Sequence, residues 1–250
     1  MKFIIALLAA LTLANGAAVA GAEECAVPPS LVASDNALTR VAQQIKEQHH
    51  LDVSVIGTGS STLPGPDGAQ FAYPARLEAA LKQQLPGTTV KVTTHVASRE
   101  TTAQMVAALQ KILAEDKPAL VIWQAGTFDA LSGVEPDTFS ANLAAGVAAI
   151  NAAGADVDLL DMQYSPHTTA VLDVTAYADV MRWVAQEHGA LLFDRLEIMR
   201  HWSEEGVFDL YAATKKYDMA RKVHDCIGRA LASQIVNAAH LDPVRMQTTR

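Results

Sequence analysis

The chain has little positive charge, few cysteines and only one long apolar run, and each shortage excludes a class of protein. Its 250 residues include 19 lysines and arginines against 27 acidic residues, which gives a formal charge of −8. This acidic balance argues against nucleic acid and against an anionic membrane surface as partners, because both are negatively charged. No internal repeat, low-complexity block or linker divides the sequence. The histidines, cysteines and acidic residues show no metal-ligand spacing, so we expect neither a metal nor another cofactor.

The one apolar run lies at the N-terminus and is typical of an export signal. Lys2 precedes apolar residues 3–13, and small residues at 18–22 offer two cleavage sites. The run is too short and too rich in alanine for a transmembrane helix. The pattern predicts a signal peptide over residues 1–22 and a single domain over residues 23–250. We expect that domain in the periplasm or secreted, without a stable membrane anchor.

The two cysteines, Cys25 and Cys226, lie at opposite ends of the predicted domain. In an oxidising compartment such a pair is expected to form a disulfide, which would tie the N-terminus to the last predicted helix. The alternative is two separately buried thiols. A bridge that closes a loop of about 200 residues would contribute a few kcal/mol in the chain-entropy account of disulfides.

Short apolar strands alternate with amphipathic helices along the whole domain. We expect strands over residues 53–56, 90–94, 119–123, 157–160 and 191–193. We expect helices over residues 37–48, 73–85, 100–114, 139–152, 177–187 and 219–238. Apolar strands that are separated by helices form parallel sheets covered on both sides. The sequence therefore predicts an α/β fold, a three-layer α/β/α sandwich around a parallel sheet of about five strands.

Residues 51–65 carry the first candidate site. A buried strand ends in a glycine-rich turn, and Ser60 and Ser61 follow at once. Open α/β sheets bind ligands beyond the carboxyl ends of their strands, so a serine here suits a nucleophile and equally suits a phosphate or sugar contact. A dinucleotide-binding turn would open directly into a helix, whereas Pro64 and Pro66 follow here, which disfavours that interpretation.

Residues 59–65 (GSSTLPG) and residues 126–129 (GTFD) resemble the first and third sequence blocks of the SGNH, or GDSL-type, hydrolases. The similarity extends from about Cys25 to Ile235. This resemblance implies a flavodoxin-like SGNH-hydrolase fold. It also implies a site in which Ser61 attacks an ester carbonyl and a histidine accepts the serine proton. In the family, backbone amides and an asparagine side chain stabilise the oxyanion.

The oxyanion positions of this chain depart from the family pattern. Arg99 stands where the second block has a glycine, so the backbone N–H remains but a long cationic side chain is added. In the third block, Gly126 and Thr127 are followed by Phe128, which stands in the place of the asparagine. Because phenylalanine cannot donate a hydrogen bond, we expect a weakened oxyanion site.

The acid–base positions depart as well. A gapless match of the last block puts Lys215 in the place of the family aspartate and Asp218 in the place of the histidine. An aspartate with an ordinary pKa is a poor general base for a serine. His224 and His167 are the alternative bases. His224 lies six residues after Asp218, so on a continuous helix it points to a different face.

Two functions from different classes remain open. The first is an exported SGNH-fold protein that is impaired in hydrolysis and binds an acyl, acidic or sugar-like ligand, or a protein partner. Arg99 and Lys215 would favour an acidic group, and Phe128 would add an apolar surface. The second is an active serine esterase that hydrolyses a small-molecule acyl or carbohydrate ester through Ser61 with an unconventional base.

Overall fold

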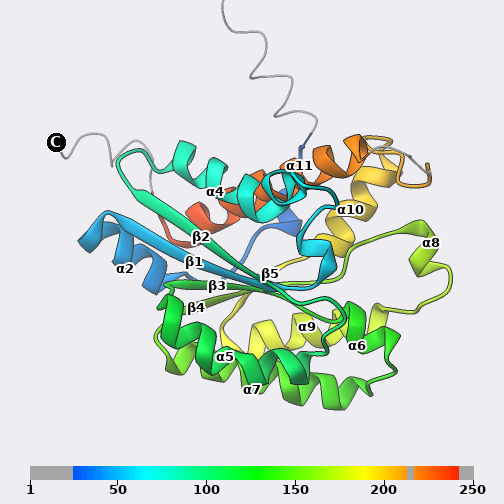
Figure 1. Cartoon of the computed structure of the whole chain (residues 1–250), viewed down its shortest axis with the longest axis horizontal. Helices are drawn as coiled ribbons and strands as arrows, with labels where there is room; N and C mark the ends of the chain where they lie inside the picture. The colour runs from blue at the N-terminus through cyan, green and yellow to red at the C-terminus, as the bar shows by residue number, and fades with distance from the viewer. Residues whose placement is uncertain (1–24, 213–216, 242–250) are drawn as a thin grey trace, which may run out of the picture.

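A five-stranded parallel sheet forms the centre of the molecule. The structure is a computed structural model, and it describes residues 25–212 and 217–241. The strands follow the order β2-β1-β3-β4-β5, and every neighbouring pair is parallel. The predicted α/β fold is therefore confirmed (Figure 1). The strands are β1 His50–Gly57, β2 Thr89–Val96, β3 Leu120–Gln124, β4 Asp156–Leu160 and β5 Leu191–Phe193.

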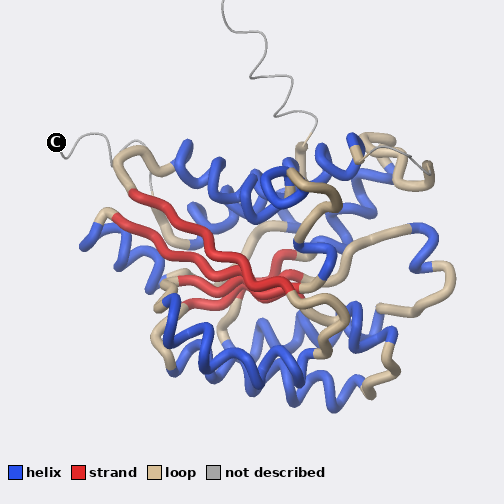
Figure 2. Tube along the Cα trace, viewed as in Figure 1, coloured by secondary structure: helices blue, strands red, loops and turns tan. Residues whose placement is uncertain are grey.

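Helices cover both faces of the sheet and complete the three layers (Figure 2). On one face pack α5, α7 and α9, and on the other α2, α4, α10 and α11. The longer helices are α2 Thr39–Gln48, α4 Tyr73–Gln84, α5 Thr102–Asp116, α7 Pro136–Ala152, α9 Thr175–His188, α10 Arg195–Glu204 and α11 Asp218–Ala238. The short ones are the 3₁₀ helices η1 Pro29–Leu31 and η2 Gly59–Ser61, and α3 Gly68–Phe71, α6 Thr127–Leu131 and α8 Pro166–Thr169.

Residue spacing explains why these helices pack as they do. Met105, Leu109 and Ile112 are buried on α5, and a spacing of four and three residues puts them on one face of the helix. On the other side of the sheet, α4 packs closely against α11. A Cβ at Gly228 would come within 2.7 Å of the backbone nitrogen of Leu77, so only glycine permits this approach of the two helices.

The strand order places a crevice between β1 and β3. From β1 the chain moves outward to β2, and it then returns to the other side of β1 to form β3. In such doubly wound sheets the crossovers on either side of the reversal leave the carboxyl ends of the two strands uncovered, and ligands bind there. The turn that carries Ser61 leaves β1 at this point.

A disulfide joins Cys25 to Cys226, as one of the two sequence interpretations predicted. It ties the start of the described chain to the middle of α11. The predicted signal peptide, residues 1–22, lies outside the described residues. Within the described ranges no helix combines the length and apolar character needed to cross a membrane.

The sequence prediction missed one longer helix, α10, and all the short helical segments. The helix α10 was not predicted, although Asp194 accepts a hydrogen bond from the Glu197 amide and so caps its start. Its apolar residues did not stand out as a helical pattern in the sequence, because charged residues such as Arg195 and Arg200 lie between them. The short helix α3 precedes Tyr73, where a loop was expected.

Candidate functional site

Ser61 ends the 3₁₀ helix η2, directly beyond β1. Its side chain is almost fully buried, with 1% of its surface exposed. The Ser61 amide donates to the carbonyl oxygen of Thr58 at 2.8 Å, which folds the turn back on the strand. A Cβ at Gly57 would overlap Ser61 Oγ, so the glycine is required to make room for the serine side chain.

Two side chains hold the Ser61 hydroxyl group. Ser61 Oγ donates to Gln124 Oε1, and the Tyr73 hydroxyl lies 3.1 Å from Ser61 Oγ. Because a serine hydroxyl has one proton, Tyr73 is the donor in the second bond. Gln124 Nε2 donates in turn to Thr58 Oγ1 at 2.9 Å and to Ser60 Oγ at 2.7 Å. The serine proton therefore points to an amide oxygen, which is not a general base at neutral pH.

Tyr73 is the one ionisable side chain that bonds to Ser61 in the part of the chain that the structure describes. Burial raises the pKa of Tyr73 to about 12, although the hydrogen bond with Ser61 opposes part of this rise. At neutral pH the phenol is therefore uncharged and cannot accept the serine proton.

His224 holds the start of α4. Its Nδ1 accepts a hydrogen bond of 2.9 Å from the backbone N–H of Tyr73, the first residue of that helix. The bond satisfies one of the amide groups that a helix start leaves without a partner. Burial, and to a smaller extent the nearby Arg195 charge, lower the pKa of His224 to about 4. The imidazole is thus neutral at pH 7, and its accepting nitrogen is occupied by Tyr73 rather than by Ser61.

The other predicted acid–base positions lie at the surface or outside the description. His167 is exposed on α8, with Nε2 3.4 Å from the carbonyl oxygen of Tyr211. Asp218 is the exposed first residue of α11. Lys215 lies outside the described residues. Neither His167 nor Asp218 is bonded to Ser61.

Two of the oxyanion positions, Arg99 and Gly126, have a positive φ, which favours glycine, but the family's asparagine side chain is missing. Arg99 has a φ of 63°, in the left-handed region that favours glycine, and its side chain is exposed. Gly126 has a φ of 95°, and a Cβ there would come within 2.5 Å of Met162 Sδ. Thr127 Oγ1 is buried without a hydrogen-bond partner among the described residues, and Phe128 is half-buried. The asparagine side-chain donor of the family is therefore missing here, and the Ser61 amide already donates to Thr58.

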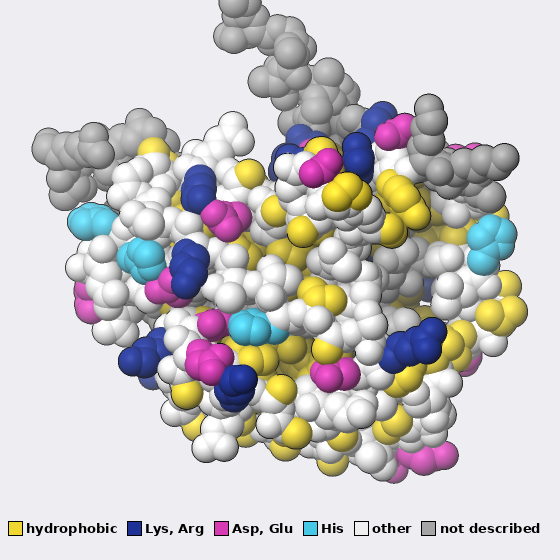
Figure 3. All heavy atoms as spheres, in the orientation of Figure 1, with side chains coloured by type: hydrophobic (Ala, Val, Ile, Leu, Met, Phe, Trp, Pro, Cys, Tyr) yellow, Lys and Arg dark blue, Asp and Glu magenta, His cyan; other side chains and the backbone are white. Residues whose placement is uncertain are grey.

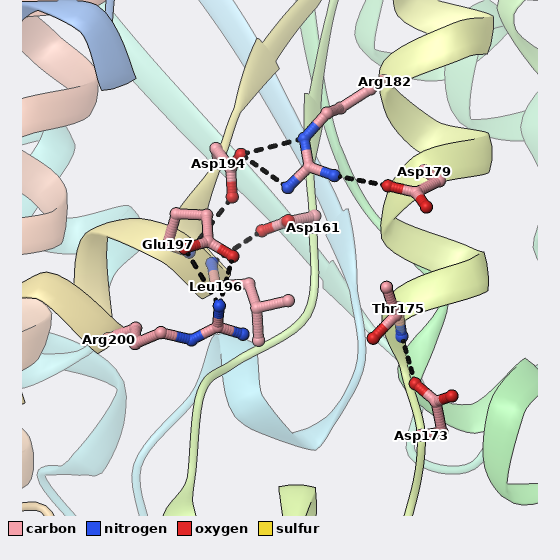
Figure 4. A network of polar contacts seen from close by, with 9 residues as sticks. All are labelled: Asp161, Asp173, Thr175, Asp179, Arg182, Asp194, Leu196, Glu197 and Arg200. Atoms are coloured by element: carbon pink, nitrogen blue, oxygen red, sulfur yellow. Dashed lines mark hydrogen bonds and ion pairs between the residues drawn. The ribbon is translucent and has the colours of Figure 1, made fainter.

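Carboxylates at the ends of β4 and β5 hold the neighbouring helices (Figure 4). Asp161 Oδ1 accepts a bond of 2.9 Å from the Leu196 amide in the first turn of α10. Asp194 Oδ2 accepts from Arg182 at 3.0 Å, and Arg182 also pairs with Asp179 at 2.8 Å. Burial, followed by the charge of Asp194, raises the pKa of Asp161 well above its usual range. These acids are engaged in structural contacts, so they do not supply a base to Ser61.

A pocket of about 480 Å³ lies beside Ser61, between η2, α3, α4 and the edge strand β2. Alanine and valine side chains form much of its wall, together with the hydroxyls of Thr62 and Thr94. Its one charged lining residue is Glu78, whose carboxylate accepts from the Val92 amide at 3.3 Å and pairs with a lysine. The size suits a small organic ligand, and the lining favours an uncharged one. No group of three or more potential metal ligands occurs in residues 25–212 and 217–241.

The sequence alone did not reveal that Gln124 and Tyr73 hold Ser61. A signal existed for Gln124, since it is the one polar residue in the buried strand β3. Its role depends on the pairing of β1 with β3, which brings the ends of the two strands together. Tyr73 gave no signal, because an aromatic residue at a helix start is ordinary core.

A model of the Non-GDSL lipase-like family matches residues 24–241 of the chain. The esterase TesA of Pseudomonas aeruginosa is 35% identical over 131 residues, which are 52% of this chain and 62% of that protein. The match thus spans less than two thirds of the length of this curated relative.

Solved structures of esterases share the fold. A crystal structure of TesA superposes with a TM-score of 0.59 at 24% identity, over 75% of this chain and 99% of that one. A catalytic mutant of Axe2, an acetylxylan esterase from Geobacillus stearothermophilus, gives 0.61 at 18% identity, over 74% and 94% of the two chains. A two-domain esterase active on acetylated mannans gives 0.66 at 11% identity, over 84% and 56%. At these identities the likeness establishes the fold alone.

Proposed function

This chain belongs to the Non-GDSL lipase-like family, within the SGNH-type hydrolases that the sequence blocks resembled, and we propose on that premise that it is an exported ligand-binding member. In this proposal the pocket beside Ser61 binds an ester-like or sugar-like molecule, and Ser61 is a polar contact rather than an activated nucleophile. The N-terminal sequence pattern and the disulfide support export to an oxidising compartment.

One observation carries the proposal: the partners of Ser61 Oγ are an amide oxygen and an uncharged phenol. A serine hydroxyl becomes a useful nucleophile only when an adjacent base accepts its proton. Gln124 cannot do so, and Tyr73 has its pKa raised to about 12 by burial. Phe128 supplies no oxyanion donor. Both contributions that accelerate acyl transfer are therefore weak.

The residues that line the pocket beside Ser61 indicate which kind of ligand it can bind. Its wall of alanine and valine side chains suits an acyl group, and its hydroxyl and amide groups suit sugar hydroxyls. Its one charged lining residue, Glu78, is an acid paired with Lys82, so the lining offers no cation to an acidic ligand. Arg99 is exposed and is not among the lining residues. Of the three ligand types that the sequence left open, we therefore favour the acyl or sugar-like ones over the acidic one.

The test compares ester hydrolysis by the purified mature protein with that of Ser61→Ala. We expect both to turn over an activated short-chain aryl ester at the same slow rate, and we expect no adduct at Ser61 with a serine-directed fluorophosphonate. Ser60→Ala is the matched control, because Ser60 bonds to the same Gln124 amide without occupying the nucleophile position. Turnover that survives Ser60→Ala and disappears in Ser61→Ala would contradict the proposal.

Such turnover would support the second candidate, an active serine esterase. The observation that favours this function is the 35% identity to a protein named an esterase. It requires that a ligand displace the Ser61 hydroxyl from Gln124 toward an imidazole. His167→Ala and His224→Ala would then identify the base, because only one of them should reproduce the loss seen with Ser61→Ala.

A further inference from the structure

A second cavity, of about 300 Å³, lies at the edge of the sheet where the strands begin. Ala119 and Ala155, which precede β3 and β4, are among its lining residues. The other lining residues belong to α2, to the last turn of α5 and to the segments that follow α5 and α7. In Figure 1, α2 and the starts of the strands lie toward the left. Because Ser61 follows the carboxyl end of β1, the length of the strands separates this cavity from the pocket beside Ser61.

Two cations and no acid line this cavity. Arg40 lies in the first turn of α2, and Lys117 directly follows α5. Neither side chain forms an ion pair within residues 25–212 and 217–241. By contrast, Figure 3 shows several lysines and arginines beside acidic side chains, and the pair of Lys82 with Glu78 is one such contact. In a chain with a formal charge of −8, two cations without a paired acid on one cavity favour an anionic ligand.

The acids closest in sequence or in charge to these cations are bonded elsewhere. The charge of Asp156 acts on Arg40, but its Oδ2 accepts two backbone amides in the first turn of α2, at 2.8 and 3.0 Å. Asp116 directly precedes Lys117, but its Oδ2 accepts from the Ser54 hydroxyl at 2.6 Å. Neither acid is among the residues that line the cavity. Both carboxylates therefore stabilise the fold, and neither occupies the position of a bound anion.

The side-chain amide of Gln44 adds an uncharged donor to the same lining. Its Oε1 accepts a hydrogen bond of 2.9 Å from the backbone N–H of Asp52. This bond fixes the orientation of the amide group, because only the oxygen can accept. Its Nε2 makes no hydrogen bond within the part of the chain that the structure describes, so both of its protons are available to a ligand.

These donors match the oxygens of a phosphate group. A guanidinium presents two parallel N–H groups, an ammonium acts as a compact charge, and a phosphate monoester offers three acceptor oxygens to them. Leu113, Pro118 and Ala119 supply an apolar part of the lining, which suits the organic part of such a molecule.

We propose that the cavity between α2 and the starts of β3 and β4 binds a small phosphorylated molecule, with its phosphate on Arg40, Lys117 and Gln44. This site is separate from the pocket beside Ser61. The inference therefore does not depend on whether Ser61 is an active nucleophile.

Isothermal titration calorimetry with inorganic phosphate, at constant ionic strength in chloride, tests the proposal on the purified mature protein. We expect the unmodified protein to bind one phosphate. The double variant Arg40→Gln, Lys117→Gly should have a Kd at least about tenfold higher, because two charged donors are lost. Both changes are compatible with the fold. Lys117 has a φ of 49°, which favours glycine, and Arg40→Gln keeps the backbone amide that donates to Asp156.

The double variant Lys46→Gln, Lys111→Gln is the matched control. It removes the same charge from exposed positions on α2 and α5 that do not line the cavity. It should bind phosphate like the unmodified protein, and so should Ser61→Ala. Melting temperatures of the two double variants should stay close to that of the unmodified protein, so that a loss of binding is not a loss of folding.

Three outcomes would overturn this proposal. One is the absence of phosphate binding by the unmodified protein. Another is an equal loss of binding in the two double variants, since the attraction would then come from the general charge of the surface. The third is acetate binding as tight as phosphate binding at the same ionic strength, because the site would then not select a phosphate group.

Discussion

At the scale of single residues, Arg99 keeps a backbone shape that its side chain opposes. Its φ of 63° lies in the left-handed region, where the Cβ of an ordinary residue crowds the backbone. The resembled family has a glycine at this position, and glycine adopts such a backbone without the steric cost. This conformation therefore lowers the free energy of unfolding of the whole protein.

Replacing Arg99 with glycine should therefore stabilise the protein. The left-handed conformation costs an ordinary residue about 1–2 kcal/mol, and the greater freedom of glycine in the unfolded chain offsets about 0.4–1 kcal/mol of the relief. We expect Arg99→Gly to raise the free energy of unfolding by about 0.5–1 kcal/mol in urea titrations. Arg99→Ala removes the same side chain but keeps the strained backbone, so it should show no gain. Equal gains in both variants would mean that the side chain, and not the backbone, is the cause.

At the scale of elements, His224 connects two helices. It is anchored in α11 and accepts the first amide of α4. His224→Phe keeps a bulky ring but removes the acceptor, so the buried Tyr73 amide loses its partner. Such a loss costs about 1–3 kcal/mol at neutral pH.

The stability lost in His224→Phe should depend on pH, and this dependence tests whether the neutral imidazole is responsible. The folded pKa of His224 is about 4, below the ordinary value of 6.5, so the unfolded chain binds a proton that the folded one does not between these values. The stability that neutral His224 contributes is present above pH 6.5 and is lost as the pH falls toward 4, by up to about 3 kcal/mol. The difference between the unmodified protein and His224→Phe should therefore shrink from pH 7.5 to pH 4.5. Exposed His188→Gln serves as the control, and a difference independent of pH would contradict the assignment.

The sequence predicted the strands and longer helices better than it predicted the contacts of the candidate site. The central strands contain short apolar runs such as residues 119–123, which can be buried on both faces, and the alternation of strands with helices favours parallel pairing. The partners of Ser61 could not be predicted in this way. Gln124 is 63 residues from Ser61 along the chain, and the two meet only because β3 returns to pair with β1. A contact that depends on strand order leaves no local pattern.

At the scale of the whole molecule, the disulfide closes almost the entire described chain into one loop. Cys25 and Cys226 are 201 residues apart in sequence. A cross-link of this length removes much of the freedom of the unfolded chain, and native disulfides typically contribute about 2–5 kcal/mol. We expect the double variant Cys25→Ser, Cys226→Ser to have a free energy of unfolding lower by about 2–5 kcal/mol, and therefore to unfold at a lower urea concentration. The unmodified protein in excess thiol should match it, and identical midpoints with and without the bridge would show that the bridge contributes no stability.

The two faces of the sheet are completed at very different times during synthesis. The face covered by α5, α7 and α9 has all its helices once residue 188 has been made. The opposite face needs α11, which begins at residue 218 and holds both the partner of α4 and the second cysteine of the bridge. A nascent chain therefore presents a half-covered sheet, with the apolar side of α4 unprotected, until α11 emerges. The packing of this face thus depends on the last described helix, and the apolar surface exposed before it docks favours aggregation.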